Sequence, residues 1–128
     1  MTWTIGTLAA AGEVGVETVR FYQRKGLLDT PERGQGTRRY GQAHLHRLRF
    51  IRRAQAAGFT LGEIAELIQL DAAQDRHRAH ALAQQRLHRL DAQIEELQRA
   101  RDRLSRLAQA CAQDRTPCAC PILAAFED

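Results

Sequence analysis

Three cysteines near the end of this 128-residue sequence are the residues best suited to chemistry. Cys111, Cys118 and Cys120 fall within ten positions of one another, and eight residues separate the first from the last. Thiolates are soft ligands, so a soft metal ion is the natural occupant: Hg(II), Cu(I), Cd(II), Pb(II) or Zn(II). Two other interpretations remain open, a redox pair formed by Cys111 with Cys118 or Cys120, and small apolar side chains packed under a last helical turn.

The start of the chain bears on the state of these thiols. Met1-Thr2-Trp3 has no basic segment followed by a long apolar run, so we expect no secretory signal and a cytoplasmic location. No apolar run approaches the roughly 18 residues that a membrane span requires. In a reducing compartment, clustered cysteines are metal ligands or redox sensors more often than structural disulfides.

A long helix must position the first cysteine, and a heptad pattern predicts it. Apolar residues recur at alternating steps of three and four up to Cys111, which is the seam of a coiled coil. Such a stripe needs a partner helix, and a second copy of the chain can provide it. Arg101 occupies one position, where its stem can lie along the stripe or its head can pair with a carboxylate. The apolar members are Leu87, Leu90, Ile94, Leu97, Leu104 and Ala108.

Positive charge is concentrated in the N-terminal half. Ten Lys and Arg residues lie between positions 20 and 53, against only Asp29 and Glu32, whereas residues 71–128 are balanced at nine of each sign. A basic segment of this kind is typical of a nucleic-acid surface, although a solvated charged face is the simpler alternative.

The N-terminal elements fit a DNA-binding domain. A helix from Thr4 to Ala11, capped by Thr4, and a second from Val16 to Gly26, where a left-handed residue can close it, are joined at Gly12 and predict a helix-turn-helix. The interrupted stretch 27–40 predicts two short strands with a basic tip, a wing, with a disordered loop as the alternative. Helices are also expected over residues 41–57 and, after the capping box that begins at Thr60, up to residue 70.

The expected architecture is mainly α. Residues 1–70 form a winged helix-turn-helix DNA-binding domain, and 71–78 form a polar hinge. Residues 79–111 form a dimerisation helix in an antiparallel coiled coil, and 112–128 form an effector-binding loop with a terminal helical turn. We find no nucleophile–base pair, phosphate loop or carboxylate dyad at useful spacing, so an enzyme is not expected.

Several short motifs, in this order, resemble the MerR family of bacterial transcription regulators, and in particular its metal-sensing branch. The segment 21–28 is similar to mercury-responsive members. The resemblance implies a homodimer that binds double-stranded DNA at a pseudo-palindromic promoter operator and distorts it for RNA polymerase, with no membrane partner. The motifs are Thr4-Ile5-Gly6, Val16-Glu17-Thr18-Val19-Arg20-Phe21-Tyr22, Lys25-Gly26-Leu27-Leu28, Arg38-Arg39-Tyr40 and Gly58-Phe59-Thr60-Leu61-Gly62-Glu63-Ile64.

On this resemblance, six residues are expected at the DNA. Thr18 and Arg20 would lie at the major-groove end of the second helix. The others would contact phosphates that set the register: Tyr22, Arg38, Arg39 and Tyr40.

The resemblance also implies a metal loop closed by Cys111 and by Cys120 with its following Pro121-Ile122-Leu123. The length of eight residues resembles mercury, lead and zinc sensors, and we favour Hg(II). Divalent-metal members usually add a cysteine from the partner's long helix, but Arg76 stands at that position and cannot bind a metal. Cys118 in the same loop, His77 or His80 across the dimer, or two-coordinate binding could replace it. Copper-type members also lack the partner cysteine, but their loop is one residue shorter.

Overall fold

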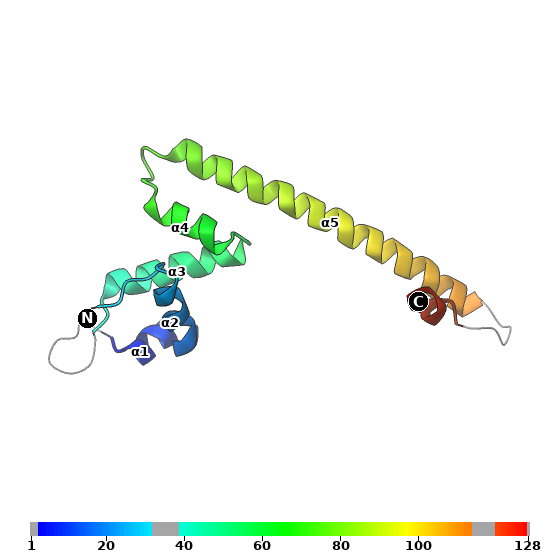
Figure 1. The fold of residues 1–128 in the computed structure, drawn as a ribbon, viewed down its shortest axis with the longest axis horizontal. Helices are drawn as coiled ribbons and strands as arrows, with labels where there is room; N and C mark the ends of the chain where they lie inside the picture. The colour runs from blue at the N-terminus through cyan, green and yellow to red at the C-terminus, as the bar shows by residue number, and fades with distance from the viewer. Residues whose placement is uncertain (1–2, 32–38, 114–119, 128) are drawn as a thin grey trace. The chain divides into compact units, whose positions relative to one another are not determined.

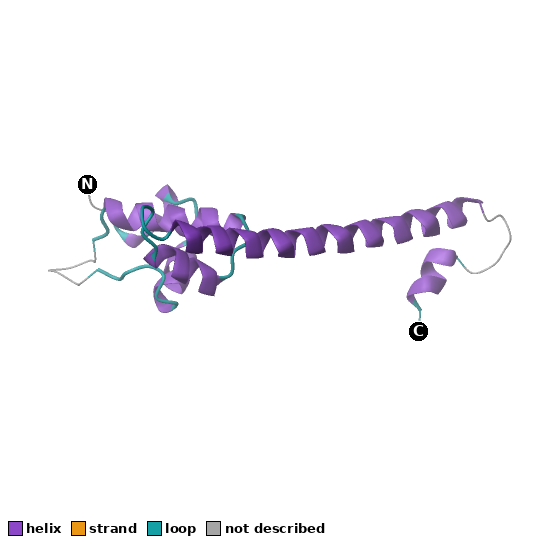
Figure 2. Cartoon of the chain, turned by 90° about the horizontal axis from the view of Figure 1, so that it is seen from above, coloured by secondary structure: helices purple, strands orange, loops and turns teal. Residues whose placement is uncertain are grey.

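The computed structural model describes residues 3–31, 39–113 and 120–127, and six helices lie in these ranges (Figure 1). The described residues contain no strand, which confirms the mainly α class (Figure 2). The chain divides into two compact units, Met1–Ala83 and Gln84–Asp128. The helices are α1 (Ile5–Ala11), α2 (Val16–Arg24), α3 (Gln42–Ala56), α4 (Leu61–Gln69), α5 (Arg76–Gln113) and α6 (Pro121–Phe126).

Local signals explain where the short helices begin and end. The hydroxyl of Thr4 accepts a hydrogen bond from the amide of Thr7 at 3.2 Å and caps α1. Gly26, with φ of 75°, takes the left-handed conformation that we predicted for the end of α2. At α4 the predicted capping box is present, since Thr60 and Glu63 each accept the other's amide through their side chains.

The core of the N-terminal unit joins α1, α2, α3 and α4. Leu8, Val19, Leu48, Ile51 and Ile64 are completely buried there. The end of α1 approaches α3 closely at Gly12, where a Cβ would lie 2.4 Å from Cδ2 of Leu48. The missing side chain of Gly12 therefore permits this contact between α1 and α3.

The predicted wing can be described only at its ends, because residues 32–38 lie outside the described residues. Tyr40, just beyond that gap, forms an isolated antiparallel bridge with Trp3, with both N–H to carbonyl distances at 2.7 Å. The bridge connects the chain at Tyr40 to the segment before α1.

The segment expected to be a hinge over 71–78 is shorter than predicted, since α5 begins at Arg76. The carbonyl of Asp75 accepts the amides of Arg78 and Ala79, both at 3.1 Å, and this starts the helix earlier than the apolar pattern suggested. From Arg76 the helix continues without glycine or proline for 38 residues, to Gln113. No described helix is long and apolar enough to cross a membrane.

Candidate thiol site and DNA-binding surface

The thiol site joins the last turn of α5 to the start of α6. Cys111 lies on α5, and Cys120 is the residue immediately before α6, with Pro121 at the first helical position. Their sulfur atoms are 3.6 Å apart and both side chains are partly exposed. This separation exceeds the roughly 2.05 Å of a disulfide, so both residues are present as thiols.

The surroundings of Cys120 favour its thiolate. The amide of Leu123 lowers the pKa of Cys120 most strongly, followed by the Cys111 thiol and the amide of Ile122. These N–H groups are the unsatisfied donors at the start of α6. Because metals and electrophiles react with the thiolate, this end of α6 prepares Cys120 for either chemistry.

The spacing of the two sulfurs fits a shared metal ion. With metal–sulfur bonds of about 2.3 Å, as for zinc, two thiolates on one ion are at most about 4.6 Å apart. The observed 3.6 Å lies within that limit. Among the described residues no group of three His, Cys, Asp or Glu side chains could hold a metal. The possible third ligand, Cys118, lies outside the described residues.

The other predicted ligands, His77 and His80, lie on the first turns of α5 and are exposed. Arg76, which stands where a partner cysteine was expected, is the first residue of that helix and is also exposed. They belong to the N-terminal unit, whereas Cys111 and Cys120 belong to the C-terminal unit. The role of His77 stays a prediction.

The helix expected in the major groove presents part of the predicted contact set. Arg20 is exposed over 54% of its side chain, and its Nη1 lies 2.8 Å from Oε1 of Glu17. Thr18 is half-buried and Arg39 is exposed, so all three can face a ligand. Arg38 lies outside the described residues.

Tyr22 and Tyr40, which are expected to contact phosphates, are each only 2% exposed in this structure, and their phosphate contacts stay a prediction. The hydroxyl of Tyr22 donates to Oε1 of Gln55, and the hydroxyl of Tyr40 accepts from Nε2 of Gln23 at 2.8 Å. Burial raises the pKa of Tyr22, although nearby Arg52 opposes the shift. Both tyrosines are core residues that fix α2 to its neighbours. Tyr22 lies three residues after the buried Val19, and this spacing is the sequence signal that both side chains share the buried face of α2.

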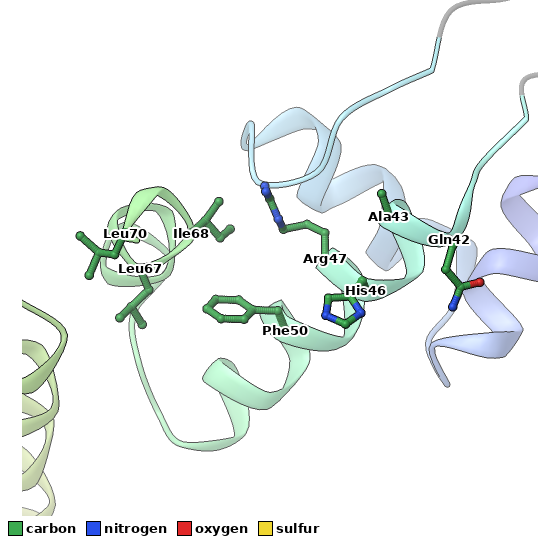
Figure 3. Close-up of a pocket in the computed structure, with 8 residues that line it drawn as sticks. All are labelled: Gln42, Ala43, His46, Arg47, Phe50, Leu67, Ile68 and Leu70. Atoms are coloured by element: carbon green, nitrogen blue, oxygen red, sulfur yellow. The ribbon is translucent and has the colours of Figure 1, made fainter. Parts of the chain in front are cut away.

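A second basic surface, missed as a site in the sequence, borders a cavity of about 520 Å³ between α3 and α4. Figure 3 shows Phe50 of α3 pointing toward Leu67 and Ile68 of α4, and Arg47 and His46 of α3 also line the cavity. Phe50 is 42% exposed. Arg49 and Arg53 line the adjoining hollow.

The predicted seam of α5 is exposed in the single chain. Leu87, Ile94, Leu97 and Leu104 are each at least 50% exposed, and Leu97 reaches 70%. Leu90 is half-buried and Ala108 is exposed. Apolar side chains at heptad spacing with this exposure require a covering surface.

Comparison with known proteins places these features in context. Residues 3–71 match the family described as MerR HTH family regulatory protein, and 45–107 match the family described as MerR, DNA binding. The mercuric resistance operon regulatory protein of Serratia marcescens is 43% identical, over 97% of this chain and 87% of that protein.

Two solved structures are also similar. A transcription regulator from Ralstonia metallidurans in complex with lead(II) has a TM-score of 0.75 at 34% identity, covering 96% of this chain and 98% of that one. A MerR family regulator lacking its sensor domain and bound to promoter DNA has a TM-score of 0.55 at 29% identity, covering 80% of each chain.

Proposed function

We propose, from the premise that this chain belongs to the MerR family of transcription regulators, that it is a homodimeric promoter switch controlled by a soft metal ion at Cys111 and Cys120. The family and the similar proteins are regulators of transcription and not enzymes. The observation that carries the proposal is the pair of thiols 3.6 Å apart at the end of a helix with an uncovered heptad seam.

DNA binding is supported by the N-terminal unit. Its helix-turn-helix exposes Arg20, and the segment 20–53 carries ten basic residues against two acidic ones. In the dimer, two such units would contact a pseudo-palindromic operator. Bending or untwisting such a site costs of order 1–6 kcal/mol, which paired phosphate contacts can offset. The proposed consequence is a promoter geometry that RNA polymerase can use. The proposed location of the protein is the cytoplasm.

The seam of α5 supports the homodimer. An antiparallel pair would cover the four large apolar side chains that one chain leaves exposed. It would also bring the thiol end of one helix toward the N-terminal end of the other, where His77 could add an imidazole.

Hg(II) is our first choice of ion, because the relative from Serratia marcescens is named for mercuric resistance and because the loop length agrees. When bound, the ion supplies strong bonds to two thiolates, which hold the end of α5 to the start of α6. Pb(II) is an alternative because a similar regulator was solved in complex with lead(II). Cu(I), Cd(II) and Zn(II) are further alternatives, since thiolates also bind these ions.

Titration of the reduced dimer with these five ions tests the proposal. We expect thiolate-to-metal absorbance to saturate at one ion per loop, with transcription rising in parallel, and Cys111→Ser and Cys120→Ser to abolish both. Lack of tight binding by every ion, or full induction in both serine variants, would refute metal sensing.

A thiol redox sensor is the second candidate, because the same two sulfurs lie close enough to form a disulfide after a small movement. It predicts induction by an oxidant without metal and a disulfide between Cys111 and Cys120 or Cys118. Mass spectrometry of the induced protein distinguishes the two mechanisms.

A further inference from the structure

The turn between α4 and α5 is a closely hydrogen-bonded joint. Oδ1 of Asp71 accepts the amides of Ala73 at 2.8 Å and Gln74 at 3.1 Å. In return, Oδ2 of Asp75 accepts the amide of Asp71 at 2.8 Å. The backbone adds a bond from the amide of Asp75 to the carbonyl of Asp71, also at 2.8 Å. Two aspartates thus close the turn from both ends.

An ion pair spans the same joint. Arg78, in the first turn of α5, donates Nη2 to Oε1 of Glu66 on α4 at 2.9 Å, and its Nε donates to the other carboxylate oxygen. A two-pronged contact between guanidinium and carboxylate fixes orientation as well as distance. It therefore restrains rotation of α5 about its own axis relative to α4.

The first turns of α5 are part of the N-terminal unit. That unit extends to Ala83, and Leu82, one turn after Arg78, is only 1% exposed. The long helix therefore starts from a packed and hydrogen-bonded base, where the sequence had suggested a polar hinge.

We propose that Glu66 and Arg78, supported by Asp71 and Asp75, are positioning residues that transmit movement of α5 to the DNA-binding unit. The inference rests on the proposed function. Within one chain, the covalent path from the thiol pair to α2 passes through this joint. A soft joint would absorb a displacement of α5, whereas a stiff joint converts it into a displacement of the bound DNA.

The pair is well suited to a test that separates coupling from folding. Its side chains are 48% and 37% exposed, and exposed ion pairs contribute little to folding stability. Variants of either residue should therefore fold. Glu66→Gln and Arg78→Met remove the pair, and Glu66→Arg combined with Arg78→Glu restores it with reversed charges. Arg103→Met, exposed on the same helix, is the matched control for a lost charge.

The experiment measures transcription with and without Hg(II) from a promoter that the wild-type dimer binds, together with operator affinity and Hg(II) binding. We expect each single variant to lower the ratio of induced to uninduced transcription about three-fold or more. Operator affinity and Hg(II) binding should stay within two-fold of wild type. The reversed pair should recover most of the ratio, and Arg103→Met should keep it.

Amide hydrogen exchange gives a readout that does not depend on the metal. We expect slow exchange at Ala73, Gln74 and Arg78 in the wild type and faster exchange in both single variants. Unprotected amides in the wild type, or an unchanged induction ratio in both variants, would overturn the inference. If wild-type transcription ignores Hg(II), the proposed ion fails, and the joint is judged on exchange and on rescue of protection by the reversed pair.

Discussion

The lowered pKa of Cys120 has a clear cause in the amides of Leu123 and Ile122 and in the thiol of Cys111. Because the Leu123 amide is the largest cause, the cysteine keeps part of its thiolate character even without its neighbour. An ordinary cysteine titrates near pH 8.5. A folded-state pKa below that of the unfolded chain stabilises the fold above the unfolded value, and this stability is lost as the pH falls through the folded value.

We therefore predict that iodoacetamide modifies Cys120 faster in the folded chain than in the denatured chain at pH values below the ordinary cysteine pKa. Cys111→Ser should reduce this difference without abolishing it, because the main cause remains. Site-resolved mass spectrometry against pH measures both rates. Equal rates in folded and denatured protein would contradict the assignment.

Gly12 is required by the packing of a single neighbour. Its Cβ would lie 2.4 Å from Cδ2 and 3.0 Å from Cγ of Leu48, which is completely buried. We predict that Gly12→Ala lowers the free energy of unfolding by about 1–3 kcal/mol, as overpacking does.

Urea unfolding with circular dichroism checks this value. Gly6→Ala is the control on the same helix, because its new Cβ meets nothing closer than 3.9 Å. Gly6 is the second residue of α1, so alanine there should not lower the free energy of unfolding. Destabilisation of both variants to the same degree would show that the Leu48 contact is not the cause.

At the scale of the elements, sequence reasoning succeeded where one local signal decides the outcome. Capping by Thr4 and Thr60 and the left-handed Gly26 follow from single residues and their immediate neighbours. It did not anticipate the tertiary contacts. Tyr22 and Tyr40 were expected at phosphates on the family resemblance, and the sequence did not predict that Gln55 and Gln23 satisfy their hydroxyls inside the unit. No spacing in the sequence predicts the hydrogen-bonded pairs Tyr22–Gln55 and Tyr40–Gln23.

The start of α5 was misplaced for a related reason. The polar residues from Asp71 to Arg78 lack an apolar period, so the pattern suggested a hinge. Hydrogen bonds of Asp71, Asp75 and Arg78 organise the segment instead. The cysteine cluster follows from composition and spacing, and the choice of Cys111 and Cys120 within it was implied by the family resemblance. The orientation of the pair relative to α6 required the folded backbone.

The exposed side chain of Arg20 makes α2 testable as the DNA-binding helix. We predict that Arg20→Ala weakens operator binding by about 1–3 kcal/mol and lowers the dependence of binding on salt concentration. Affinities measured at several salt concentrations give both quantities. Arg99→Ala, exposed on α5, serves as the control, and an unchanged affinity and salt slope for Arg20→Ala would remove α2 from the interface.

At the scale of the whole molecule, the uncovered seam sets the expected assembly. Leu97 is 70% exposed in one chain and lies at the middle of the heptad stripe. We predict that Leu97→Asp converts the dimer to a monomer at micromolar concentration, because a buried unpaired carboxylate opposes association. Analytical ultracentrifugation measures the change, with Gln98→Asp beside the seam as control. A dimer that survives Leu97→Asp would exclude this face.

Because α5 is unbroken, it also fixes the angular position of Cys111 around the helix relative to the seam. Each residue turns the helix by about 100° and advances it by about 1.5 Å. Deleting one residue between the seam and Cys111 would therefore rotate the Cys111 thiol to another face of α5 while shortening the helix very little. Adding seven residues would lengthen it by about 10.5 Å and leave the thiol almost in phase. The rotation of α5 about its axis, rather than its length, therefore determines the direction in which the Cys111 sulfur points.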